Sequence, residues 1–167
     1  MRIQNVAKRY LFLSLSVALV IFAAGCASKK TSPDGGMSDT AAADENASGD
    51  SDSGKAMGLQ TIHFPYDSFA LDAENKERLK ANTEILKANP SLKVQIEGHC
   101  DQRGGIQYNI ALGEKRANSV KKYMEDMGVQ GDRLTVISFG KERVADQAMT
   151  EDAFAKNRRA NFVITSR

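Results

Sequence analysis

The pattern of hydrophobic and polar residues divides the chain into three parts. An apolar run fills residues 10–24, and residues 27–58 contain no Val, Ile, Leu or aromatic residue. Periodic patterns of apolar residues begin at about residue 59. Because a folded core needs apolar side chains at regular spacing, we expect the compact domain to comprise residues 59–167.

Alternating and helical patterns in residues 59–167 predict an order of βαβαβ(α)β. Strands are predicted over 61–64, 92–97, 134–139 and 159–165, and helices over 72–87, 106–127 and 151–157. Helices that alternate with strands favour an α/β (α+β) sandwich, in which two main helices cover one face of a mixed four-stranded sheet. The strand at 134–139 has apolar residues on both faces, which predicts a central position in that sheet.

The N-terminal segment has the features of a secretory signal. Arg2, Lys8 and Arg9 precede an uncharged run of about 15 residues, whereas a membrane-spanning helix needs about 20. The run ends at Ala23-Ala24-Gly25-Cys26, which resembles the lipobox of bacterial lipoproteins. The resemblance implies cleavage after residue 25, diacylglycerol on the Cys26 sulfur and acylation of the new amine. An uncleaved membrane anchor and an ordinary signal peptide with a chance cysteine are the alternatives.

Residues 26–58 are predicted to comprise the lipidated cysteine and a flexible tether that follows it. Residues 27–58 hold six acidic residues and three lysines, and they lack the apolar side chains that would offset the entropy cost of ordering them. A random coil of this length spans roughly 30 Å. Residue 27 is Ala and not Asp, so the resemblance to lipoproteins implies sorting to the outer membrane.

Composition excludes several classes of protein. The 167 residues include 23 Lys and Arg against 21 Asp and Glu, a net charge of +2, which is too small to indicate a nucleic-acid partner. Two cysteines permit at most one disulfide, so the chain is not a disulfide-stapled small domain.

The candidate binding residues lie between the second predicted strand and the long helix. Asp101 is in the loop that follows the strand, and Arg116 leans from the helix back toward that loop. Leu112 lies one turn before Arg116, as an apolar floor. A carboxylate and a guanidinium held apart suit a zwitterion, with Arg116 gripping a carboxylate by two hydrogen bonds. Alternatively, Asp101 caps the following turn, and Arg116 is a surface cation or the ion-pair partner of Asp101.

Residues 98–120, GHCDQRGGIQYNIALGEKRANSV, resemble the signature of OmpA-like peptidoglycan-binding domains, in particular those of lipoproteins that act with the Tol system. The resemblance extends over about 60–167 and implies non-covalent binding of the meso-diaminopimelate in peptidoglycan stem peptides. Asp101 and Arg116 would then form the central pair, and Leu112 would line the pocket. Asn109 would order the loop or touch the ligand, and Tyr66 and Asp67 would form the opposite wall.

The resemblance also implies a partner and a place in the cell. We expect an outer-membrane lipoprotein, anchored by lipid on Cys26, with its domain in the periplasm and a TolB-like protein as partner during cell division. A general cell-wall anchor without TolB is the alternative. A hydrolase would need a zinc site or a reactive thiol near His99 and Cys100, and the sequence offers no suitable ligand set, so we expect no enzyme, metal or cofactor. Pro65, unusual for these domains, leaves the shape of the Tyr66 wall open.

Overall fold

The computed structural model describes residues 49–167. The predicted signal peptide, the predicted lipidation site at Cys26 and the predicted tether as far as residue 48 lie outside the described residues. The elements are β1 (Ile62–His63), α1 (Ala73–Ala88), β2 (Lys93–His99), α2 (Ile106–Asp126), a short 3-10 helix (Gly131–Arg133), β3 (Leu134–Gly140), α3 (Glu151–Asn157) and β4 (Arg159–Ser166). This confirms the predicted order. Within residues 49–167, no helix has the length and apolar character needed to cross a bilayer.

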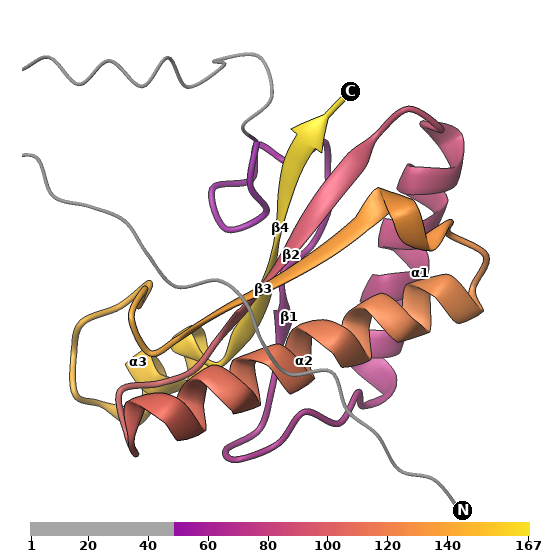
Figure 1. Ribbon diagram of the computed structural model, residues 1–167. Helices are drawn as coiled ribbons and strands as arrows, with labels where there is room; N and C mark the ends of the chain where they lie inside the picture. The colour runs from indigo at the N-terminus through magenta and orange to yellow at the C-terminus, as the bar shows by residue number, and fades with distance from the viewer. Residues whose placement is uncertain (1–48) are drawn as a thin grey trace, which may run out of the picture. The chain divides into compact units, whose positions relative to one another are not determined.

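The strands form one mixed sheet in the order β1-β4-β2-β3. β2 and β3 run parallel, whereas β4 is antiparallel to both of its neighbours. The long helices α1 and α2 pack against one face of this sheet (Figure 1). The predicted fold class is therefore confirmed.

The predicted central position of the strand at 134–139 is wrong, because β3 is an edge strand and β4 is central. Val136 packs against the core, but Ile137 is 37% exposed on the other face. Phe139 stacks on His99, and the Arg143 guanidinium lies 3.7 Å from the centre of its ring. These local contacts use the apolar side chains on the second face of β3, so the apolar pattern does not require a strand on either side.

The boundaries of the two long helices follow local signals in the sequence. The Asp72 carboxylate accepts a hydrogen bond of 2.8 Å from the Asn75 backbone N–H and so caps α1. Gly128 has a φ of 98° just beyond α2, a left-handed conformation that ends many helices. Leu79 and Leu86 of α1 are fully buried.

The folded region begins earlier than the predicted boundary at residue 59. Asp50 bridges to Val163 of β4, and Ala56 is fully buried. The Ser51 hydroxyl lies 2.6 Å from the Asn161 side-chain oxygen. Polar contacts, which a search for apolar periodicity does not detect, hold this segment against β4.

The backbones of α2 and the sheet approach closely at two glycines. A Cβ atom on Gly98 of β2 would lie 1.9 Å from the Gly113 carbonyl oxygen, and one on Gly113 would lie 2.3 Å from the Ser138 hydroxyl. The absence of side chains at Gly98 and Gly113 therefore sets the distance between helix and strand. This contact fixes the position of α2 relative to the end of β2, where the candidate site lies.

The variant Gly98→Ala is expected to lower the free energy of unfolding by about 1–3 kcal/mol, because backbone atoms have to shift to admit the methyl group. Urea unfolding of the full chain in detergent measures this change. Gly105→Ala is the matched control, because a Cβ there meets nothing within 4 Å. Equal stabilities of the two variants would contradict the close-approach argument.

Candidate functional site

A pocket of about 250 Å³ lies between the end of β2, the start of α2 and the turn that precedes α1. It is lined by all six residues that the sequence singled out within the described region: Tyr66, Asp67, Asp101, Asn109, Leu112 and Arg116. Segments that are far apart in the chain thus meet at one end of the sheet.

Asp101 is buried and receives four hydrogen bonds from two arginines. Arg103 donates its backbone N–H to Oδ1 at 3.1 Å, its Nε to Oδ1 at 3.3 Å and its Nη2 to Oδ2 at 2.7 Å. Arg158 donates Nη1 to Oδ2 at 3.3 Å. Burial alone would raise the pKa of Asp101, but these hydrogen bonds and charges outweigh it and lower the pKa. Asp101 is therefore a fixed negative charge at neutral pH.

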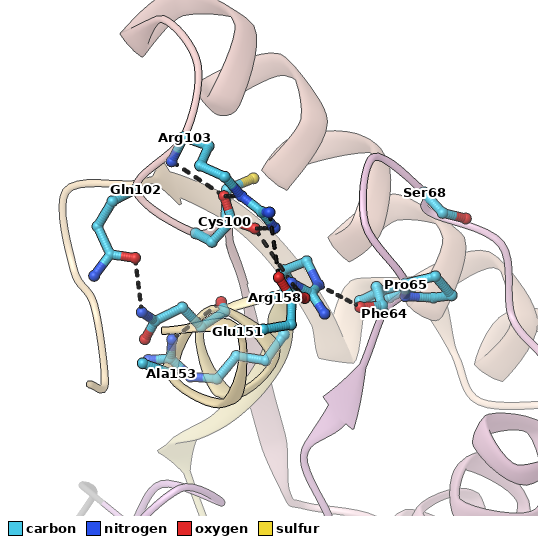
Figure 2. A network of polar contacts seen from close by, with 12 residues as sticks. Phe64, Pro65, Ser68, Cys100, Gln102, Arg103, Glu151, Ala153 and Arg158 are labelled. Atoms are coloured by element: carbon cyan, nitrogen blue, oxygen red, sulfur yellow. Dashed lines mark hydrogen bonds and ion pairs between the residues drawn. The ribbon is translucent and has the colours of Figure 1, made fainter. Parts of the chain in front are cut away.

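The two arginines are held in turn by α3 and by aromatic rings. Glu151 accepts hydrogen bonds from Arg158 at 2.8 Å and from Arg103 at 3.3 Å, and Figure 2 shows the two guanidinium groups converging there. Arg158 also donates Nε to the Phe64 carbonyl at 3.0 Å. The Arg103 guanidinium lies 4.3 Å from the Tyr66 ring centre and 4.4 Å from that of Phe154. This network connects the loop, α3 and the opposite wall of the pocket.

Arg116 is 1% exposed, and its hydrogen bonds go to main-chain oxygens and a thiol. Nε donates to the Ser68 carbonyl at 2.8 Å, and Nη2 donates to the Pro65 carbonyl at 3.1 Å. Nη1 donates to the His99 carbonyl at 2.9 Å and to the Cys100 sulfur at 3.4 Å. Burial lowers the pKa of the guanidinium, although an arginine stays charged in a protein.

These contacts revise the expected role of Arg116. Asp101 and Arg116 line the same pocket but form no ion pair with each other, and Arg116 pairs with no carboxylate within residues 49–167. Four of its five N–H groups are already used, so the expected grip on a ligand by two hydrogen bonds does not fit this arrangement. Arg116 presents one further N–H and an uncompensated positive charge.

The loop at 100–105 is shaped by side chains from α2 and from the segment after β3. Asn109 is buried, and its amide donates to the carbonyls of Arg103 at 2.7 Å and of Gly105 at 3.0 Å. Lys141 donates to the Gly104 carbonyl at 2.7 Å. Of the two roles left open for Asn109, ordering the loop is therefore present in the structure.

The turn at 65–68 forms the opposite wall. Asp67 has a φ of 51°, and its carboxylate accepts a hydrogen bond from the Tyr108 hydroxyl of α2. This bond raises the pKa of Tyr108, which keeps the hydroxyl protonated. Pro65 contributes its carbonyl oxygen to this wall, where it accepts the hydrogen bond from Arg116.

His99 and Cys100 do not act on each other. The His99 ring stacks on Phe139, whereas the Cys100 thiol donates to the Asn109 carbonyl at 3.3 Å and lines the pocket. Burial raises the pKa of the Cys100 thiol, which opposes formation of a reactive thiolate. Within residues 49–167, no three His, Cys, Asp or Glu side chains are grouped to hold a metal ion.

Arg103, Tyr108 and Arg158 also line the pocket, but they are not among the site residues predicted from the sequence. Arg103 is two residues from Asp101 and Tyr108 lies in the first turn of α2, so their positions in the sequence point to the site. Arg158 lies 57 residues from Asp101 along the chain. No local pattern indicates that it reaches the pocket.

The fold and this pocket define a small α/β binding domain with fixed charges of both signs at one end of its sheet. The sequence model of the OmpA family matches residues 63–158. The chain belongs to the OmpA family.

Proteins with the name peptidoglycan-associated lipoprotein are similar to much of the chain. That of Legionella pneumophila is 34% identical over 90% of this chain and 93% of its own length. That of Pasteurella multocida is 41% identical over 60% of this chain and 67% of its own. The crystal structure of the Burkholderia pseudomallei protein superposes with a TM-score of 0.61 and 32% identity, over 63% of this chain and 89% of that one.

The variant Arg158→Met is expected to lower the free energy of unfolding by about 2–3 kcal/mol, because it removes a buried partner from Asp101 and a donor from the Phe64 carbonyl. Urea unfolding measures the change. Lys156→Met, two residues earlier in the last turn of α3, is the control, since it breaks only an ion pair with Asp146 at the surface and should leave stability unchanged. An effect of Arg158→Met as small as that of the control would contradict a structural role for the network.

Asp101 is expected to make stability depend on pH. Its folded pKa is lower than the ordinary value of about 3.9, so its contribution is complete above that value and is lost as the pH falls through the folded pKa. Urea unfolding of wild type and Asp101→Asn between pH 7 and pH 2 measures the stability gap between them. The gap should be constant above about pH 5 and shrink below about pH 4. A gap that widens toward acid would show a raised pKa instead.

Proposed function

We propose that this protein binds peptidoglycan non-covalently through the pocket around Asp101 and Arg116. The observation that carries the proposal is a buried guanidinium without a carboxylate partner in the described chain, beside a fixed carboxylate in one pocket. Membership of the OmpA family and similarity to peptidoglycan-associated lipoproteins support the same ligand. The protein acts as a binding protein, not an enzyme.

The finer proposal is that the pocket takes the side-chain end of meso-diaminopimelate in a stem peptide. A ligand carboxylate would neutralise the charge of Arg116 and accept its remaining N–H. The ligand ammonium would lie near the carboxylates of Asp101 and Asp67, and Leu112 would contact the methylene chain. A lysine-type stem peptide has the ammonium but lacks the carboxylate beside it, so the pocket should discriminate between the two.

The second part of the proposal concerns the anchor. Acyl chains on Cys26 would hold the protein in the outer membrane, and the residues after Cys26 would let the periplasmic domain reach the wall. A TolB-like protein is the proposed partner at cell division. Capture of TolB by the immobilised full chain, beyond that by bare resin, is expected for this role. A general wall anchor would capture no more TolB than the bare resin.

The first test is co-sedimentation of the full chain, in detergent, with purified diaminopimelate-type sacculi. Wild type is expected to pellet, and Asp101→Ala and Arg116→Gln are expected to lose tenfold or more in affinity, because each removes a charge that faces the ligand. Circular dichroism confirms that each variant is folded.

Two controls sharpen this test. Asp126→Ala and Arg78→Ala remove the same kinds of charge from exposed ion pairs outside the pocket, so they should pellet like wild type. Lysine-type sacculi should leave wild type in solution. If folded wild type fails to pellet with diaminopimelate-type sacculi, peptidoglycan binding is wrong for this chain. If it pellets equally with both kinds of wall, the diaminopimelate assignment is wrong.

A further inference from the structure

The Tyr108 hydroxyl makes a contact across the pocket to which the proposed function assigns no role. Tyr108 lies in the first turn of α2, Asp67 lies in the turn before α1, and both line the pocket. The hydroxyl donates its hydrogen bond to the Asp67 carboxylate. The Tyr108 side chain is 56% exposed, so burial alone does not hold the ring in this position. The bond, which we call the Tyr108–Asp67 bridge, connects two walls that are 41 residues apart in the chain.

The turn at 65–68, which forms the wall on the Asp67 side, needs such a contact to keep its conformation. Asp67 has a φ of 51°, a left-handed conformation that is unfavourable for a non-glycine residue, although Asp tolerates it better than most. The turn belongs to no helix or strand, and β1 before it is only two residues long. Its conformation therefore depends on hydrogen bonds made by the residues around it.

Other contacts hold the turn on either side of Asp67 but not the Asp67 side chain. Arg116 binds the carbonyls of Pro65 and Ser68 from inside the domain. The Tyr66 ring rests on the Arg103 guanidinium. The Asp67 carboxylate, within residues 49–167, has the Tyr108 hydroxyl as its sole hydrogen-bond partner. Tyr108 thus determines where that negative charge lies.

We propose that Tyr108 is a positioning residue, whose hydroxyl fixes the Asp67 carboxylate and the turn at 65–68 so that the pocket keeps the width its ligand requires. The inference rests on the proposed function, because the ligand is the same diaminopimelate stem peptide. It adds that the affinity depends on a side chain of α2 acting through Asp67. Without the bridge, the Asp67 side chain no longer connects the turn to α2. Ligand binding then has to order the turn, which lowers the affinity.

The test is calorimetric titration of the full chain with a soluble disaccharide-tripeptide that contains diaminopimelate. Tyr108→Phe keeps the ring and removes only the hydroxyl, and it is expected to weaken binding about threefold to tenfold, the range of one hydrogen bond. Asp67→Asn keeps an oxygen that accepts from Tyr108 and should keep the turn in place. A loss of affinity in this variant therefore reports the charge of Asp67 and not the bridge. Tyr108→Phe should cause no further loss in an Asp67→Ala background, because the bridge is already absent there.

Tyr123→Phe is the matched control, since it makes the same change on the same helix away from the pocket and should bind like wild type. Backbone amide exchange at residues 66–68 gives a second readout, and it should be faster in Tyr108→Phe than in Tyr123→Phe. If wild type binds the muropeptide and Tyr108→Phe binds it equally, the inference is wrong and the proposed function stands. If wild type does not bind, the proposed function fails, and unchanged exchange at 66–68 would overturn the positioning role as well.

Discussion

The candidate site depends on one buried guanidinium. Arg116 joins three segments that are remote in sequence, because it binds the His99 carbonyl at the end of β2 and the carbonyls of Pro65 and Ser68 in the turn before α1. The Phe64 ring lies 5.2 Å from the guanidinium carbon and adds a cation–π contact. The Pro65 and Ser68 carbonyls belong to irregular backbone that no ladder of strand or helix hydrogen bonds would satisfy. One side chain therefore both shapes the pocket and charges it.

The second charged group of the pocket is stabilised in a different way. Asp101, Arg103, Arg158 and Glu151 satisfy one another, so two cations face two carboxylates at the junction of the loop and α3. A buried carboxylate is costly unless its oxygens are hydrogen-bonded, and those of Asp101 receive four donors. The result is a carboxylate whose position and ionisation are fixed before a ligand arrives, which reduces the ordering that binding requires.

Local sequence signals predicted local structure well and long-range contacts poorly. Asp72 and Gly128 mark helix ends through local chemistry, and the helix ends predicted at residues 72 and 127 lie within one residue of those observed. Two features depend on partners elsewhere in the chain and leave no periodic pattern in the sequence. They are the edge position of β3 and the folding of the segment near Ser51 against β4. The same limit applies to Arg116: the sequence placed it near the Asp101 loop, but neither its burial nor the carbonyls that accept its hydrogen bonds were predicted.

The balance of charge in the pocket explains why stability alone does not account for Arg116. Arg103 and Arg158 pair with Asp101 and Glu151, whereas Arg116 forms no ion pair with the remaining carboxylate of the lining, Asp67. Carbonyl dipoles solvate Arg116 but do not neutralise it, and an uncompensated buried charge costs free energy that an apolar residue would not. The carboxylate of the proposed ligand would supply the ion-pair partner that Arg116 lacks. Arg116 therefore holds three segments together and still leaves its charge unpaired, and this unpaired charge favours the proposed binding function.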